Sequence, residues 1–425
     1  MRYPFFYGWL ILSLSTLGLL FSLPGQTNGV SAFTDPLLSA TGLSRAELSF
    51  AYLIGTLASS LLLSAGGRLY DRLGPRILGS LVSGILGIIL ILASQSYRLL
   101  ALFPGRPIIP FILFTLIFFA LRFLGQGLLT LTSRNMVMQW FTVNRGRANA
   151  IMGLCMAFGF ALAPRFFHTL IQHWEWNGAW LFLGCLELLF MGLFWSFGRK
   201  APARPAQMRI SKGKPKPCEG RDFTLKEAQQ TSSFWVFSLS LSLQSLFITA
   251  QTFHISSIFH HAGLGREQAF SIFFPAAILA TTVNFFASWL SDRIALRNIL
   301  AFQAAGLALS SLSQSLLSYN FSLAFWGIVI GNGICGGLFN LINTVTWPRF
   351  YGTKHLGAIS GRGMAFLVGG SALGPYLFSL NLKLSGSYSQ TVLSIALLAA
   401  ILVLISLRLP VLPERKISRQ TAVPP

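Results

Sequence analysis

The sequence predicts an all-α membrane protein with twelve transmembrane helices in two pseudo-symmetric six-helix bundles. Its 425 residues are 53% hydrophobic and only 10% charged, whereas about a quarter of the residues in soluble domains are charged. Apolar runs of about 20 residues recur along the whole length, and each can cross a bilayer as a helix. A basic, Pro-rich segment divides these runs into two sets of six, and the two sets share sequence.

The runs are predicted to be helices rather than barrel strands. Only helices and closed barrels satisfy all their backbone hydrogen bonds in lipid, and the strict polar–apolar alternation of barrel strands is missing here. Turn and charge signals place the helices at residues 7–33, 47–66, 77–96, 109–140, 148–170, 179–197, 232–256, 268–290, 298–317, 321–346, 357–379 and 389–409.

The first three helices are separated by distinct signals. One Arg, Arg2, precedes helix 7–33, and the apolar run that follows is too long for a signal peptide, so we expect this helix to be retained. Helices 47–66 and 77–96 are joined by "GGRLYDRLGPR", a charged connection with a Gly-Pro turn.

Helices 109–140, 148–170 and 179–197 complete the first half. Helix 109–140 contains Arg122 near its middle, where a charge is costly unless it faces a cavity or a partner. Arg122, Gln126, Thr130 and Ser133 lie on one helical face, while Arg134 lies off it and is better suited to gating or packing. Helix 148–170 has small residues at three- and four-residue spacing, which permits close packing.

The second half repeats this order. Helix 232–256 carries Gln251 and His254, helix 321–346 carries Asn332 and Asn343, and helix 357–379 is again rich in small residues. A membrane-embedded Asn or Gln also serves as interhelical glue, and this alternative stays open for each of them.

The same signals divide the chain into domains. The predicted domains are an N-terminal six-helix bundle at 1–197, a cytoplasmic linker at 198–231, a C-terminal six-helix bundle at 232–410 and a cytoplasmic tail at 411–425. About 23 of the 32 Lys and Arg residues fall on the side shared by the termini and the linker. The positive-inside rule therefore places both termini in the cytoplasm and the helices in the inner (cytoplasmic) membrane.

The two halves are related by an offset of 221 residues. "TGLSRAELS" falls on "AGLGREQAF", and without a gap the same offset carries "RLYDRLGPR" onto "WLSDRIALR". Asp71, Arg72 and Arg76 thereby align with Asp292, Arg293 and Arg297. One offset that holds across a whole helix and both its flanks indicates an internal repeat.

"GRLYDRLGPR" resembles the signature that major facilitator superfamily transporters carry between their second and third helices. The matching residues are Gly67, Leu69, Asp71, Arg72, Gly74 and Arg76; the second-half echo keeps Asp292, Arg293 and Arg297 but has Ala295 for the glycine. The resemblance implies a gating motif in which Asp71 faces the N-terminus of the eleventh helix near Gly357. The alternative is that these charges only set topology.

The superfamily resemblance also implies a substrate cavity at mid-membrane between the halves, lined by the first, fourth, seventh and tenth helices. The candidate substrate-binding residues are Arg122, Gln126, Asn28, Gln251, Asn284, Asn332 and Asn343. For Arg122, a structural tie to a neighbouring helix is the alternative to a cavity-lining role.

Within the superfamily, the opening through "WFTVNRGRANAIMG" resembles the oxalate/formate and monocarboxylate transporter branch. Many monocarboxylate carriers have an Arg on the eighth helix, eight residues before its terminal Asp, and Asn284 stands at that position here. Arg122 or Arg362 would then have to bind a carboxylate.

Energy coupling is left open. Glu187, His254 and Asp35 are the candidates for a titratable group that couples transport to protons, although each also suits a structural role. A uniporter or an anion exchanger needs none of them.

We therefore predict a secondary active transporter of a small organic anion such as a monocarboxylate, working by alternating access. The alternatives are a carrier of neutral solutes, an efflux carrier of lipophilic compounds and, with less support, a non-transporting sensor. The sequence lacks H-E-x-x-H and G-x-S-x-G motifs, so no enzyme activity, metal or cofactor is expected. The expected partners are the substrate and the lipid bilayer, with a proton as the optional coupling ion, no nucleic acid, and a monomer as the working unit.

Overall fold

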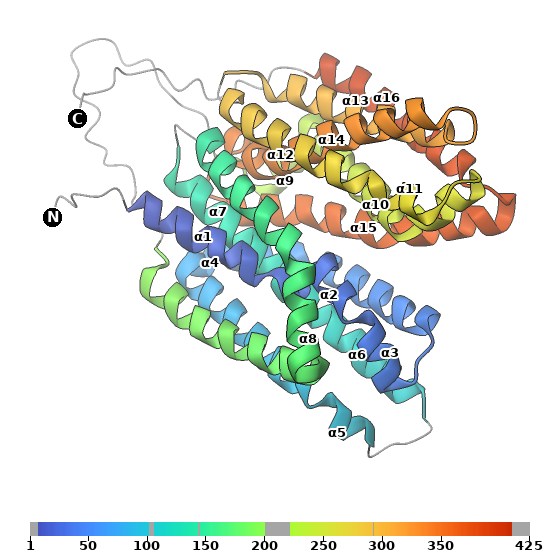
Figure 1. The fold of residues 1–425 in the computed structure, drawn as a ribbon. Helices are drawn as coiled ribbons and strands as arrows, with labels where there is room; N and C mark the ends of the chain where they lie inside the picture. The colour runs from blue at the N-terminus through green and yellow to red at the C-terminus, as the bar shows by residue number, and fades with distance from the viewer. Residues whose placement is uncertain (1–6, 102–105, 143–144, 200–221, 292, 410–425) are drawn as a thin grey trace, which may run out of the picture.

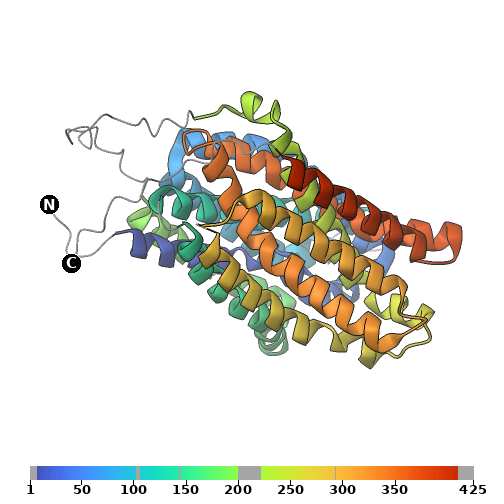
Figure 2. The same cartoon turned by 90° about the horizontal axis from the view of Figure 1, so that it is seen from above.

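The computed structural model describes residues 7–101, 106–142, 145–199, 222–291 and 293–409. The ordered elements in these ranges are helices that run roughly along one common axis (Figures 1 and 2). They form two bundles, coloured blue to green and yellow to red in Figure 1. The predicted all-α architecture is confirmed.

The first bundle is continuous in sequence. It contains α1 (Gly8–Phe21), the 3₁₀ turn η1 (Leu23–Gly25), α2 (Thr27–Ala32), α3 (Thr34–Thr41), α4 (Arg45–Ser94), α5 (Ser96–Ala101), α6 (Ile108–Leu121), the π-helical segment η2 (Arg122–Leu129), α7 (Thr130–Trp140) and α8 (Arg145–Phe197).

The second bundle follows a short helix, α9 (Leu225–Gln229). It contains α10 (Ser232–His261), α11 (Arg266–Ser271), α12 (Phe273–Leu290), α13 (Leu296–Ser315), α14 (Phe321–Phe350), α15 (Leu356–Ser385) and α16 (Ser389–Arg408).

Two of these helices bend sharply, and each therefore contains two membrane helices. In α4 the backbone turns at Gly74, where φ is 78°, a left-handed value that glycine adopts at little cost. In α8 it turns at Glu175, where φ is 56°. The helix before Gly74 continues through Asp71, so residues 66–73 are helical rather than the connection that the sequence predicted.

Within the described ranges, helices lie at the positions of all twelve predicted membrane helices. Nine helical segments of the described residues are long and apolar enough to span a membrane, and one of them, residues 45–101, crosses twice because of its turn at Gly74. The limb of α8 before Glu175 and α13 lie at the positions of the remaining two predicted membrane helices. The chain is therefore a multi-pass membrane protein.

The first membrane helix differs from its prediction. A continuous helix was expected over residues 7–33, but α1 ends at Phe21 and Gln26 is extended, with a ψ of 159°. The break contains Pro24 and Gly25. A Cβ added to Gly25 would lie 2.9 Å from the Cα of Gly125, so the absence of a side chain lets the break approach the fourth membrane helix closely.

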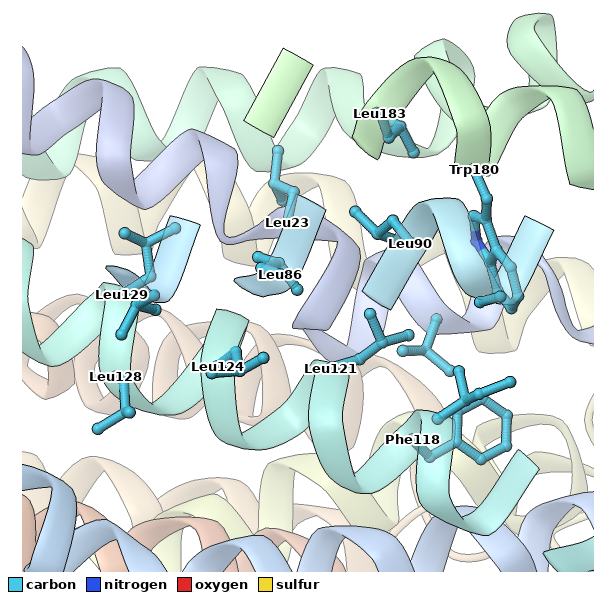
Figure 3. Close-up of a cluster of buried hydrophobic side chains, with 14 of the residues drawn as sticks. Leu23, Leu86, Leu90, Phe118, Leu121, Leu124, Leu128, Leu129, Trp180 and Leu183 are labelled. Atoms are coloured by element: carbon cyan, nitrogen blue, oxygen red, sulfur yellow. The ribbon is translucent and has the colours of Figure 1, made fainter. Parts of the chain in front are cut away.

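The first bundle has an apolar core that positions the fourth membrane helix. Leu121, Leu124 and Leu128 on that helix are buried, and Figure 3 shows Leu121 and Leu124 next to Leu86 and Leu90 of α4. Because one face of the helix is fixed in this core, its polar residues are directed elsewhere.

The end of the predicted linker packs against the second bundle. Phe223 N–H donates to the Tyr351 carbonyl over 3.0 Å, and the Tyr351 hydroxyl lies 2.7 Å from Oγ1 of Thr231. Burial raises the pKa of Tyr351 to about 12, so this hydroxyl stays neutral. Most of the linker and the tail 411–425 lie outside the described residues, and the domain limits set from the sequence stay a prediction.

Candidate functional site

Arg122 lies at the centre of the candidate site, near the middle of the fourth membrane helix. Its side chain is only 1% exposed. Nη1 donates to the Gly25 carbonyl and to Oγ1 of Thr27, both over 3.2 Å, and the guanidinium carbon lies 5.2 Å from the centroid of the Tyr52 ring. Nε and Nη2 have no hydrogen-bond partner. A buried guanidinium with two free donor groups can bind an anion.

The break in the first membrane helix creates part of this site. Where a helix stops, its last carbonyls lose their intrahelical donors, and Arg122 binds one such carbonyl, that of Gly25. The segment that begins at Arg122 is π-helical, a rare geometry that is frequent at functional sites. The sequence indicated the charge at this position, but Thr27 and Tyr52 are ordinary residue types that carried no signal.

The rest of the predicted polar stripe also faces the first membrane helix. Thr130 Oγ1 donates to Ser22 Oγ over 3.3 Å, and Gln26 Nε2 donates to Thr130 Oγ1 over 3.2 Å. Gln126 is buried, and its Oε1 has no partner. Arg122 and Gln126 thus retain free polar atoms near mid-membrane, whereas Thr130 is used in helix packing.

Asp71 joins the two bundles. Its Oδ1 accepts from Gly357 N–H over 2.7 Å and its Oδ2 accepts from Ala358 N–H over 2.8 Å. Both donors lie in the first turn of α15, where unsatisfied N–H groups and the helix dipole favour a negative charge. The structure therefore places Asp71 where the family resemblance implied. We call the end of the bundle where residues 66–76 lie the signature end.

Glycines allow the backbones to meet beside this carboxylate. A Cβ added to Gly361 would lie 2.7 Å from the Leu63 carbonyl, and one added to Gly357 would lie 2.8 Å from Oδ1 of Asp71. Gly67 packs directly on Gly357. Any larger residue would separate α4 from α15 and lengthen the hydrogen bonds of Asp71.

Further polar contacts join the bundles at the same end. Asn135 Nδ2 donates to Ser360 Oγ over 2.8 Å, and Asn149 Nδ2 donates to Ser288 Oγ over 2.9 Å. Arg145 Nη1 donates to a carbonyl of α14 over 3.2 Å. Figure 1 shows the bundles close together at this end, on the left, and diverging towards the right.

Arg134 also bridges the bundles from the fourth membrane helix. Its Nη1 donates to Oγ1 of Thr344 over 3.0 Å, and its Nη2 donates to Oδ1 of Asn340 over 3.1 Å. Both acceptors belong to α14 and are neutral. The side chain is 9% exposed, and its Nε has no partner.

Two arginines of the signature and its repeat bind helix ends. Arg76 Nε donates to the Trp195 carbonyl over 2.6 Å, and Arg297 Nη1 donates to the Leu409 carbonyl over 3.2 Å. These carbonyls lie at the C-terminal ends of α8 and α16, where positive charge is favourable. Arg72 and Arg293 are exposed, with Arg293 over the Trp289 ring, while Asp292 lies outside the described residues.

Gln251 and Asn332 belong to a buried chain of amides. Gln251 Nε2 donates to Oε1 of Gln314 over 2.8 Å, and Asn332 Nδ2 donates to Oε1 of Gln251 over 2.9 Å. Ser310 Oγ donates to Oδ1 of Asn332 over 2.7 Å. Both ends of each predicted amide are therefore engaged inside the second bundle, which favours the interhelical alternative over substrate contact.

The remaining predicted binding residues lie at different places. Asn284 is buried where α12 meets α8, and its Oδ1 accepts from Ser288 Oγ over 2.9 Å. Asn343 is buried on α14 beside Thr344. Asn28 lies in α2, and its side chain is outside the described part of the structure. The structure does not bring Asn284 or Asn343 together with Arg122, whereas Asn28 directly follows Thr27, which accepts from Arg122. The binding role of all three stays a prediction.

The three coupling candidates are separated from Arg122. Glu187 is buried between two limbs of the first bundle, where its Oε2 accepts from Ser83 Oγ over 2.6 Å. His254 Nε2 lies 3.0 Å from the Pro375 carbonyl. Asp35 is 78% exposed in a 2.5 Å ion pair with Arg45. Within the described ranges, no three His, Cys, Asp or Glu side chains form a group that could hold a metal ion.

Comparison with known proteins was made for the whole chain. The sequence profile described as the Major Facilitator Superfamily matches residues 10–375. No curated protein matches the chain in sequence.

Several solved structures share the fold. A proton:xylose symporter bound to a bromo-deoxyglucose is 16% identical, with a TM-score of 0.69 over 96% of this chain and 98% of that one. A human organic anion transporter is 17% identical, with a TM-score of 0.62 over 95% and 100%. A bacterial homologue of the iron transporter ferroportin, in an outward-facing state, is 17% identical, with a TM-score of 0.69 over 94% and 99%. At these identities the similarity shows the fold alone.

Proposed function

The chain belongs to the major facilitator superfamily, and from that premise we propose that it carries a small organic anion, such as a monocarboxylate, across the cytoplasmic membrane by alternating access. Members of this family are transporters that bind small molecules in the membrane. The oxalate/formate and monocarboxylate branch remains part of the proposal, as does a monomeric working unit.

One observation supports an anion above other substrates. Arg122 lies near mid-membrane with Nε and Nη2 unpartnered, and within the described part of the chain no carboxylate pairs with it. A buried charge without a counter-ion is costly, and a bound carboxylate would supply both the opposite charge and two acceptor oxygens. Gln126 Oε1, also unpartnered, would contact a polar group on the same substrate.

The contacts between the bundles support the transport cycle. Asp71, Asn135 and Arg134 connect the bundles at the signature end. We place this end and both termini in the cytoplasm, because most basic residues lie there. The structure then corresponds to a state closed to the cytoplasm, in which Arg122 is buried. Opening to the cytoplasm requires these contacts to break.

A transporter of neutral or lipophilic solutes is the second candidate. The hydrogen bond from Arg122 to the Gly25 carbonyl and its packing on the Tyr52 ring are also the contacts of an arginine that only holds two helices together. In that case Arg122 stabilises the break in the first membrane helix and contacts no substrate.

Flux measurements distinguish the two candidates. Proteoliposomes containing the protein are given radiolabelled formate, lactate and oxalate, a neutral amino acid and a lipophilic cation, each with and without a proton gradient. We expect saturable uptake of a carboxylate, reduced at least about tenfold in Arg122→Gln because a charge-assisted pair is lost. Arg122→Lys should retain part of it, because the charge stays while the bidentate geometry is lost.

Arg98→Gln is the matched control, because Arg98 is an exposed arginine whose side chain contacts Tyr97 rather than Arg122. Its flux should equal that of the unchanged protein. Carboxylate uptake that survives Arg122→Gln in normally folded protein would contradict the binding role, and flux of only neutral or cationic solutes would establish the second candidate. The response to the gradient decides whether protons are coupled.

A further inference from the structure

A second buried arginine on the same membrane helix resembles the first in its surroundings. Arg134 lies twelve residues after Arg122, which is about 18 Å along a helix. It is buried, and one nitrogen, Nε, has no partner. No carboxylate contacts it within the ranges that the structure describes, since its hydrogen bonds end on the neutral oxygens of Asn340 and Thr344. The guanidinium charge is therefore uncompensated.

The two acceptors of Arg134 depend on the state of the protein. Asn340 and Thr344 belong to α14 in the second bundle, whereas Arg134 belongs to α7 in the first. When the bundles part at the signature end, Arg134 loses both hydrogen bonds at once. A desolvated guanidinium left without acceptors is unfavourable, so opening becomes easier if another acceptor replaces them.

We propose that Arg134 is a second binding site for the transported anion, formed when the signature end opens. This inference rests on the proposed function. In the closed state Asn340 and Thr344 accept hydrogen bonds from the guanidinium. In the open state a carboxylate accepts two parallel hydrogen bonds in their place. The anion binds Arg122 while the signature end is closed, and it binds Arg134 on its way to or from that end.

An arginine that acts only as a lock between the bundles is the competing explanation. Both explanations predict that removing Arg134 favours the open signature end. The two explanations differ in which face of the membrane is affected. Only if Arg134 binds the anion does its removal lower the affinity for anion presented at the signature end. A matched variant is available in the double substitution Asn340→Ala with Thr344→Ala, which removes the lock and keeps the guanidinium.

The experiment compares uptake kinetics in membrane vesicles of the two orientations, with radiolabelled lactate and oxalate as probes. For Arg134→Gln we expect the KM at the signature face to rise at least about tenfold relative to the double variant, and the KM at the opposite face to match that of the double variant. Arg134→Lys should recover part of the affinity at the signature face.

The outcomes separate this proposal from the previous one. Equal KM values for Arg134→Gln and the double variant at the signature face would overturn the second site and leave the lock, with the role of Arg122 unaffected. If the unchanged protein transports neither probe nor formate from either face, the proposed function is wrong and the second site with it. Labelling of a cysteine at Ser360 shows independently that the lock variants still fold and open.

Discussion

At the scale of single residues, one carboxylate makes two of the hydrogen bonds that join the bundles. Both oxygens of Asp71 accept from backbone N–H groups at the start of α15. The favourable term is the attraction between a full negative charge and the positive end of a helix, worth about 0.5 to 2 kcal/mol in partly buried sites. An amide of the same shape lacks that charge, and its NH₂ group faces a backbone donor.

We therefore expect Asp71→Asn to shift the protein towards the state that is open at the signature end. A loss of about 0.5 to 2 kcal/mol corresponds to a roughly two- to thirtyfold change in the equilibrium between the closed and open states. A cysteine at Ser360, buried in the closed state, should react correspondingly faster with a polar maleimide in a background without the native cysteines.

Asp35→Asn serves as the control, because Asp35 is an exposed carboxylate with no contact between the bundles. It should leave the labelling rate unchanged. An unchanged rate in Asp71→Asn as well would show that the carboxylate does not hold the signature end closed.

At the scale of elements, the break in the first membrane helix forms the site as much as Arg122 does. The carbonyl of Gly25 accepts from Arg122 because the helix has ended there. The break fits against η2 only while residue 25 has no side chain, since an added Cβ would lie 3.0 Å from the Gln126 nitrogen and closer still to other backbone atoms.

Gly25→Ala is thus expected to push the first and fourth membrane helices apart. Overpacking of this kind typically costs about 1–3 kcal/mol, so the melting temperature in detergent should fall by several degrees and carboxylate uptake should drop with it. Gly192→Ala is the matched control, because Gly192 is a helical glycine with no atom near its added Cβ. It should melt at or above the temperature of the unchanged protein. Equal melting temperatures for both variants would mean that the break tolerates a side chain.

At the scale of the whole molecule, the contacts that close the signature end include two separate seams. In one, Asp71 of α4 binds α15; in the other, Asn149 of α8 donates to Ser288 of α12. The seams share no residues, yet a rigid-body rocking of one bundle against the other must open both.

The two seams are expected to contribute additively to closure. Asn149→Ala alone should speed labelling of the Ser360 cysteine, although Asn149 lies in the other seam. In the double variant, the free-energy shifts of Asn149→Ala and Asp71→Asn should add within about 0.5 kcal/mol. If Asn149→Ala leaves that labelling unchanged, the seams open independently and the bundles do not move as rigid bodies.

Sequence patterns determined the membrane helices, their two sets of six and the carboxylate of the signature. The length of an apolar run and the placement of charges are local properties, so they can be recognised from the sequence alone. The offset that aligns Arg76 with Arg297 also predicted a structural equivalence, because both arginines bind the end of the last helix in their own half. Arg122 was identifiable because a charge in mid-membrane is rare.

Only the tertiary structure decided which polar residues are satisfied by packing and which keep free hydrogen-bonding atoms. Gln251 and Arg122 are both candidate binding residues in the sequence, but Gln251 has both amide ends engaged in its own bundle and Arg122 has two donors free. The surroundings of Arg134 were also invisible in the sequence, because its acceptors come from a helix more than 200 residues away. The physical reason is that a polar atom acts on a ligand only if its neighbours leave it unsatisfied, and those neighbours are brought together by packing between distant helices.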